Sequence, residues 1–228
     1  MNKNTTTEII IPFYKIIFVG ETGVGKTQII QKFLTGKFTN EHLSTVGLDF
    51  GRKYIENDEG IFKLQIIDTA GNEELKVPEI KEYYESIDAI IIVFDIQNKD
   101  ALKGIIKERK FINSLNLENN SYTIIIVGNK TEDKEKRMIS VEDGKNFCLE
   151  GEHYFEVSAK DGKYINDLFD LAVKSINEKK RDIEKLENDI LNKKKSNKNE
   201  ENKRCCQIYW FLKIIYFKKN LKYCIYYN

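Results

Sequence analysis

Residues 13–27 read Phe13-Tyr-Lys-Ile-Ile-Phe-Val-Gly-Glu-Thr-Gly-Val-Gly-Lys-Thr27. The β-branched apolar run predicts a buried strand, the glycines predict a tight turn, and the apolar spacing from Lys26 to Thr35 predicts a helix. A GxxxxGK[ST] loop between a strand and a helix surrounds nucleotide phosphates with backbone N–H groups. We expect Lys26 to neutralise the β and γ phosphates and the Thr27 hydroxyl to bind Mg²⁺. The loop residues expected to contact phosphate are Gly23, Val24 and Gly25.

Up to about residue 177, short apolar runs alternate with longer mixed segments. We expect strands at 13–19, 47–56, 61–67, 88–96, 122–127 and 153–157. Candidate helices fill 26–35, 78–86, 99–115, 141–150 and 163–175. The turn from Asn57 to Gly60 leaves no room for a crossover helix, so the second and third strands should form an antiparallel hairpin. The pattern predicts an α/β fold, a doubly wound and mostly parallel six-stranded sheet with one antiparallel edge strand and helices on both faces.

The charge balance and the cysteine positions of the chain limit which classes of protein and of binding partner are expected. The chain has 228 residues, with 37 basic and 36 acidic side chains, and this balance gives no argument for nucleic acid as a partner. The four cysteines, at positions 148, 205, 206 and 224, suit neither a disulfide framework nor a zinc site. The amino terminus lacks a secretory pattern, so we expect an intracellular chain. Its expected division is an N-terminal extension (1–12), one domain (13–177), a charged linker or helix extension (178–204) and an apolar, basic tail (205–228).

A second phosphate-binding element ends the third expected strand, in Asp68-Thr-Ala-Gly-Asn72-Glu73. A carboxylate at the end of a strand next to the phosphate loop suits a magnesium site, which assigns Asp68 to the metal. Gly71 leaves its backbone N–H open to the γ phosphate.

With both elements, residues 13–177 resemble the Ras superfamily of small GTPases, and the Rab branch most closely. The resemblance implies the P-loop GTPase fold, GTP and GDP as bound nucleotides, and Mg²⁺ as cofactor. Thr45, in Ser44-Thr-Val-Gly-Leu-Asp-Phe50, matches the switch threonine that closes on magnesium and the γ phosphate. Phe38 matches the aromatic residue that flanks the guanine. The Rab likeness rests on Val46 to Phe50, Lys63 to Ile67, Tyr83-Tyr84 and the cysteine pair.

The resemblance also implies an effector surface and a guanine site. Phe50, Ile67 and Tyr83 would form an apolar patch across the two switches, although the same three residues also suit a plain core. For the base, the motif in Gly128-Asn-Lys-Thr-Glu132-Asp133 matches at Asn129 and Lys130 but has Glu132 where the family has aspartate. The longer carboxylate keeps the acceptor chemistry that selects guanine. The last motif, at Ser158, Ala159 and Lys160, matches the family, and the Ala159 N–H is expected at the guanine oxygen.

The catalytic position departs from the family. Asn72 stands where the family has the glutamine that orients the attacking water, and its amide falls short by about 1.5 Å, the length of one C–C bond. Thr22 occupies a second size-sensitive position beside the γ phosphate. No arginine precedes Thr45 in its loop, so a partner would have to supply positive charge to the transition state. We expect slow intrinsic hydrolysis.

Cys205-Cys206 match the cysteines that receive two prenyl groups in Rab proteins, but here 22 residues follow them. The apolar run in this tail, from Ile208 to Phe217, is too short and too interrupted by Lys213 to span a bilayer. Two interpretations stay open for it: a segment that lies at a membrane interface, and a product of read-through or of an incorrect gene boundary.

The sequence therefore predicts a Rab-like GTP/GDP switch that regulates vesicle traffic from the cytoplasmic face of an endomembrane. Its expected partners are an exchange factor, a GTPase-activating protein and effectors, with the membrane reached by prenylation. The alternative is a guanine-nucleotide-binding module that does not hydrolyse GTP and acts as a membrane-associated scaffold.

Overall fold

The computed structural model describes residues 10–39, 45, 47–71, 80–84, 86–117 and 121–196. Its strands are β1 (Phe13–Val19), β2 (Leu48–Asn57), β3 (Gly60–Thr69), β4 (Ala89–Asp95), β5 (Thr123–Asn129) and β6 (His153–Glu156). Its helices are α1 (Lys26–Thr35), α2 (Ile80–Tyr84), α3 (Ala101–Ser114), α4 (Val141–Asn146) and α5 (Ile165–Ser196).

These strands form one six-stranded sheet in the order β2-β3-β1-β4-β5-β6. Every neighbouring pair is parallel except β2 and β3, which pair antiparallel from Asn57 opposite Gly60 to Leu48 opposite Thr69. The predicted fold and its antiparallel edge strand are confirmed. Because five strands run in the same direction, the carboxyl ends of β1, β3, β4, β5 and β6 meet at one edge of the sheet, where nucleotides bind in such folds.

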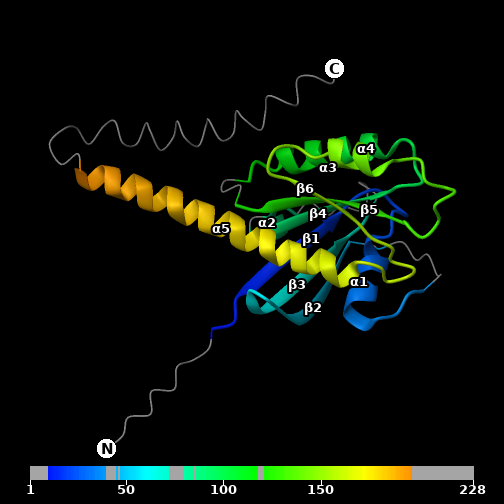
Figure 1. The fold of residues 1–228 in the computed structure, drawn as a ribbon, viewed down its shortest axis with the longest axis horizontal. Helices are drawn as coiled ribbons and strands as arrows, with labels where there is room; N and C mark the ends of the chain where they lie inside the picture. The colour runs from blue at the N-terminus through cyan, green and yellow to red at the C-terminus, as the bar shows by residue number, and fades with distance from the viewer. Residues whose placement is uncertain are drawn as a thin grey trace, which may run out of the picture.

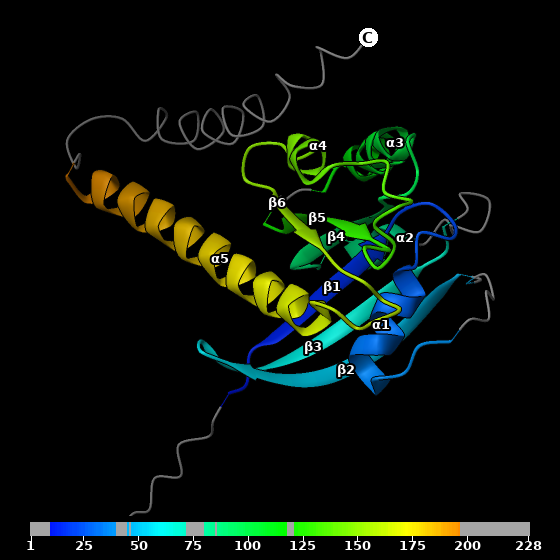
Figure 2. The same ribbon diagram turned by 45° about the vertical axis from the view of Figure 1, so that its right-hand side comes forward.

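The sheet separates two apolar cores, one on each face. Figures 1 and 2 show the helices that cover the two faces. Side chains alternate along β1, so that Ile16 and Phe18 join the core beneath α1 and α5, whereas Ile17 and Val19 join the core beneath α2 and α3. In β4 the positions that face either core are apolar, and all of its side chains except Asp95 are buried. This explains why buried parallel strands read as continuous apolar runs in the sequence.

Two helix ends differ from the predicted boundaries by more than two residues. Helix α4 ends at Asn146 rather than Glu150, because the Arg109 guanidinium takes the Phe147 carbonyl as a hydrogen-bond acceptor and Gly151 turns the chain at a φ of 84°. Helix α5 continues beyond the expected helix at 163–175 to Ser196, into the segment expected as a charged linker or helix extension. Residues 178–196 lack glycine and proline, so nothing in the segment interrupts the helical backbone. Within the described residues, no helix has the length and the apolar content that crossing a bilayer requires.

Candidate functional site

The phosphate loop connects β1 to α1 at the shared carboxyl edge. Gly25 caps α1 in the left-handed region at a φ of 98°, and a Cβ there would lie 2.3 Å from the Asn129 side-chain nitrogen. Only glycine satisfies both restrictions. Lys26 is buried, and its ammonium donates to the carbonyls of Gly20 at 2.7 Å and Glu21 at 3.0 Å. Neutral carbonyls are weaker partners for an ammonium than phosphate oxygens are, so a nucleotide would displace these bonds.

Thr27, Thr45 and Asp68 meet at the end of β3. The Thr27 hydroxyl donates to Asp68 Oδ2 at 2.5 Å, the Thr45 hydroxyl reaches the same oxygen at 3.3 Å, and the two hydroxyl oxygens lie 3.0 Å apart. The three residues expected to bind magnesium are thus brought together. Burial raises the pKa of Asp68, and the hydrogen bond from Thr27 and the charge of Lys26 oppose that rise.

The other carboxylate oxygen, Asp68 Oδ1, is buried and has no hydrogen-bond partner among the described residues. A buried anionic oxygen without a partner is costly, and a divalent cation or its bound water would satisfy it. Two hydroxyls and one carboxylate suit Mg²⁺, which commonly takes its remaining ligands from water and nucleotide phosphates. The residues therefore fit the cofactor.

Gly71 lies directly against the phosphate loop. A Cβ on Gly71 would come within 2.5 Å of the Thr22 backbone nitrogen and 2.6 Å of its Cα. These are backbone atoms, which cannot move aside as a flexible side chain can. The close approach brings the Gly71 backbone next to the loop, as the γ-phosphate assignment requires. Thr22 has an exposed side chain at the same place.

The guanine motifs meet at the ends of β5 and β6. Asn129 is buried, donates to the Val24 carbonyl at 2.9 Å, and accepts the Ala159 backbone N–H at 3.1 Å. This one side chain joins the phosphate loop to the loop after β6. In this structure the Ala159 N–H is donated to Asn129, so a contact with the guanine oxygen would have to share or replace that bond.

Glu132 and Ser158 are also brought together. The Ser158 hydroxyl donates to Glu132 Oε2 at 2.6 Å, and it accepts the Asp161 backbone N–H at 3.1 Å. The neighbouring Asp133 turns away from this site and pairs with Lys136 at 2.7 Å. The carboxylate at position 132 is therefore the one directed to the base motifs. Lys160 is exposed at the same loop.

Asp95 and Gln97 hold Lys130, and the sequence did not single out either of them. The Lys130 ammonium pairs with Asp95 at 2.7 Å, while Gln97 donates to the Lys130 carbonyl at 3.1 Å. Lys130 has a φ of 71°, which is unusual for a residue other than glycine. Asp95 ends the buried strand β4, and an acidic residue at that position is the same signal that identified Asp68.

Phe38 follows α1, where two hydrogen bonds between Gln28 and Thr39, both 3.2 Å long, hold the segment against the helix. The Phe38 side chain is half-buried and packs against the core beneath α1 and α5. Asn72, Cys205 and Cys206 lie outside the described residues.

The expected effector patch needs one correction. Phe50 and Tyr83 are 45% and 38% exposed, and their ring centroids lie 5.6 Å apart. Ile67, cross-strand partner of Phe50, is 1% exposed and belongs to the core beneath α2 and α3. The assignment of Ile67 to the effector surface is wrong, because its side chain packs into the core beneath α2 and α3. For this residue the core interpretation holds, of the two that the sequence left open.

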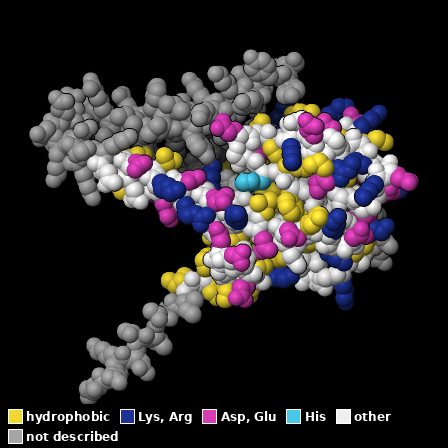
Figure 3. All heavy atoms as spheres, viewed as in Figure 1, with side chains coloured by type: hydrophobic (Ala, Val, Ile, Leu, Met, Phe, Trp, Pro, Cys, Tyr) yellow, Lys and Arg dark blue, Asp and Glu magenta, His cyan; other side chains and the backbone are white. Residues whose placement is uncertain are grey.

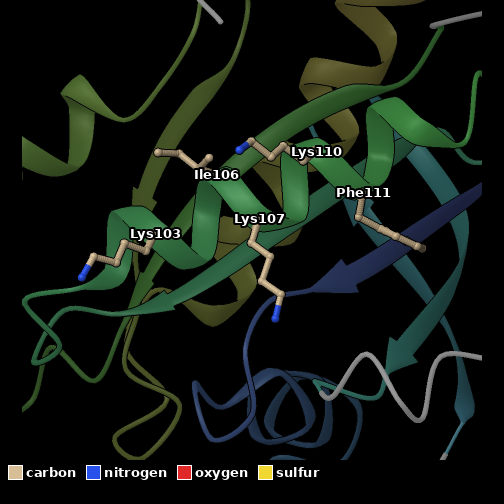
Figure 4. Close-up of a pocket in the computed structure, with 5 residues that line it drawn as sticks. All are labelled: Lys103, Ile106, Lys107, Lys110 and Phe111. Carbon is tan, nitrogen blue, oxygen red and sulfur yellow. The ribbon is translucent and has the colours of Figure 1, made fainter. Parts of the chain in front are cut away.

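A separate hollow lies on α3, away from these loops. Figure 4 shows its lining residues, Lys103, Ile106, Lys107, Lys110 and Phe111. Lys103 is paired with Asp100 at 2.7 Å. None of the nucleotide motifs lines this hollow, so it is distinct from the candidate site.

A sequence model of the Ras family matches residues 15–178, which is most of the chain. The chain belongs to the Ras family. The Ras-related protein Rab7 of Cenchrus ciliaris is 27% identical over 198 residues, which cover 84% of this chain and 96% of the relative. The Ras-related proteins RABG3c and RABG3d of Arabidopsis thaliana are each 30% identical over 167 residues, which cover 71% of this chain and 81% of each relative. The chain is thus a Rab-like small GTPase of the Ras superfamily.

Proposed function

We propose that this Rab-like chain binds GTP and GDP with Mg²⁺ and hydrolyses GTP slowly, as a switch in vesicle traffic. The observation that carries the proposal is the convergence of Thr27 and Thr45 on Asp68, whose second oxygen is buried without a partner among the described residues. Thr45 comes from the loop between α1 and β2, so its position responds to whatever occupies the phosphate loop.

The residues have separate tasks in this proposal. Lys26 and the backbone N–H groups of the loop bind the β and γ phosphates, and the Gly71 backbone lies where the γ phosphate ends. Bound Mg²⁺ would neutralise charge on the β and γ phosphates. Loss of the γ phosphate releases the Thr45 loop, which changes the surface that Phe50 and Tyr83 present to effectors.

Guanine selection rests on the second group of residues. Glu132 accepts from the guanine edge, Lys130 packs over the ring, and Asn129 fixes both loops. Phe38 flanks the base, and Ser158, Ala159 and Lys160 complete the site. Titration with fluorescent guanine and adenine nucleotides tests this assignment, and equal affinity for both would overturn it. Lys26→Ala should lose most of the affinity, because an ammonium beside clustered phosphates has no substitute.

Turnover is the second part of the proposal. Asn72 is one bond too short to orient water well, so Asn72→Gln should raise phosphate release under single-turnover conditions and leave nucleotide affinity nearly unchanged. Thr22→Gly alone and in combination tests whether Thr22 obstructs the same water. No phosphate release from any of these variants would favour the scaffold that does not hydrolyse GTP.

The cellular part of the proposal follows from the Rab likeness. An exchange factor, a GTPase-activating protein and effectors would act on the switch, and the activating protein would supply the arginine that the Thr45 loop lacks. Prenylation of Cys205 and Cys206 would place the chain on the cytoplasmic face of an endomembrane. Mass spectrometry of the endogenous carboxyl terminus tests the lipid directly.

A further inference from the structure

The outer part of α5 carries an apolar stripe, here named the α5 seam, which consists of Ile183, Leu186, Ile190 and Leu191. At 100° per residue these four side chains fall on one side of the helix. Leu186 and Leu191 are 55% and 52% exposed, and the two isoleucines are half-buried. In Figures 1 and 2 this part of α5 projects beyond the sheet, clear of the other described elements. The stripe is therefore an apolar surface that the described part of the chain does not cover.

Acidic side chains border the α5 seam on both sides. By the same helical geometry, Asp182 and Asp189 lie along one border and Glu184 along the other, while Glu187 falls between Ile183 and Leu191. Lys185 is the one basic residue between positions 182 and 192, and it faces away from the seam, in an exposed pair with Asp182 at 3.6 Å. Figure 3 shows charged and apolar side chains interspersed along α5. An apolar stripe with acidic borders fits an apolar segment with basic borders.

We propose that residues 210–221 of this same chain cover the α5 seam as an antiparallel helix. Trp210, Ile214, Phe217 and Leu221 recur at alternating spacings of four and three residues, which places them on one face of a helix. Lys213 and Lys218 border that face on opposite sides. Residues 205–228 contain four lysines and no acidic residue, so their charge complements that of the seam.

The connection between the two segments is long enough for this arrangement. Residues 197–209 separate the end of α5 from Trp210, and an extended chain of that length spans about 40 Å. Ile183 lies about 20 Å back along α5 from Ser196, at 1.5 Å per residue. The chain can therefore reverse direction and still reach the whole seam.

A tethered segment suits this seam better than a second copy of the chain does. The seam covers fewer than two heptads, whereas an independent coiled coil needs about three or four. A short linker gives the tail an effective concentration near the millimolar range, so a weak contact suffices within one chain.

Trp210 is the one tryptophan of the sequence, so its fluorescence reports on this contact directly. In the full-length, unlipidated chain we expect a blue-shifted emission and weak quenching by acrylamide, both independent of protein concentration. Ile183→Glu with Ile190→Glu should shift the emission to the red and increase quenching, because the indole loses its apolar contact. Asn188→Glu with Asn192→Glu is the matched control, since it adds the same two negative charges on the side of α5 away from the seam and should change neither reading.

A charge-reversal pair tests the lysine borders. Glu184→Lys with Asp189→Lys, one change on each border, should expose Trp210 at low salt, and adding Lys213→Glu with Lys218→Glu should restore its protection. Circular dichroism checks that α5 stays helical in every variant. Three results would each overturn the proposal: an indole already exposed in the wild type, protection that grows with concentration alongside dimers in sedimentation, and protection that arises only with anionic phospholipid vesicles.

Discussion

At the scale of single residues, Glu132 has one methylene more than the aspartate that the family has at this position, and this difference bears on the selection of guanine. Its Oε2 accepts the Ser158 hydroxyl at 2.6 Å, so in the proposed guanine site this carboxylate would have to serve Ser158 and the guanine edge together. The longer side chain has to bend to do both. Neighbouring Asp133 cannot take over without giving up its pair with Lys136.

Glu132→Asp should therefore tighten GTP binding, by about 1 to 3 kcal/mol if a strained hydrogen bond is restored. Asp133→Asn is the matched control, because it alters an exposed pair and should leave the affinity unchanged. Fluorescent nucleotide titration measures both variants. Equal affinity in Glu132→Asp and the wild type would mean that the loop already compensates for the longer side chain.

The sequence predicted the residues of the candidate site but not the residues that hold them. Thr27, Thr45 and Asp68 were predicted from motifs, and they meet in the structure. The Asp95 contact to Lys130 was not predicted, because it depends on the pairing of β4 with β5, where Asp95 lies opposite Asn129. The sequence left the burial of Ile67 undecided for a similar reason, because the alternation of side chains along a strand does not show which face of the strand a helix covers.

At the scale of elements, the end of β6 is held by a network outside the nucleotide site. Arg137 pairs with Glu156 through two hydrogen bonds of 2.9 and 2.7 Å, and the Tyr154 hydroxyl donates to the same carboxylate at 2.6 Å. Burial alone would raise the pKa of Glu156, but the bonds from Arg137 and Tyr154 outweigh it and leave the pKa below its usual 4.5. Glu156 directly precedes the loop that carries Ser158 and Ala159, so this network positions part of the proposed base site.

A carboxylate with a lowered pKa stabilises the fold above its ordinary pKa, and that contribution disappears as the pH falls through the lowered value. Glu156→Gln should cost about 1.5 to 3 kcal/mol of unfolding free energy near neutral pH, because hydrogen bonds to a charged group are lost. The difference from the wild type should shrink as the pH falls below 4.5. Urea unfolding at several pH values measures it, with the exposed Glu150→Gln as control. A difference that stays constant with pH would rule out the charge as its source.

Element boundaries were predictable where backbone signals are strong. Helix α1 has the predicted bounds because Gly25 and Gly36 stop it at both ends in the left-handed region. Helix α4 was predicted too long because its end depends on Arg109, which comes from α3 and is distant in sequence. Its capping box at Ser140 and Asp143, in contrast, is local.

At the scale of the whole molecule, the hairpin between β2 and β3 anchors the base of the α5 extension. Glu59 in that turn accepts hydrogen bonds from Asn177 and Arg181, and Asn177 also accepts one from Tyr14 on β1. On the other side of the helix Lys180 pairs with Asp88 at 2.8 Å. The extension therefore begins from several fixed contacts with the sheet.

Glu59→Ala should loosen the start of the extension and leave nucleotide binding unchanged, because the anchor is remote from the phosphate loop. The contribution is expected to be about 0.5 to 1 kcal/mol, since the pair with Arg181 is partly exposed. Hydrogen exchange should become faster for amides near residues 177–185. Asp58→Ala, in the same turn, is the control. Unchanged exchange in Glu59→Ala would assign the anchor to Lys180 and Asp88.

The unbroken course of α5 also fixes a direction in space. A flexible chain as long as the stretch from Asn177 to Ser196 would spread its far end in all directions, at a root-mean-square distance of roughly 25 Å. The helix instead places that end at one point, about 30 Å along its axis. Whatever binds the chain beyond Ser196 thus meets the nucleotide domain in a set orientation, and no conformational entropy of this stretch has to be given up at each encounter.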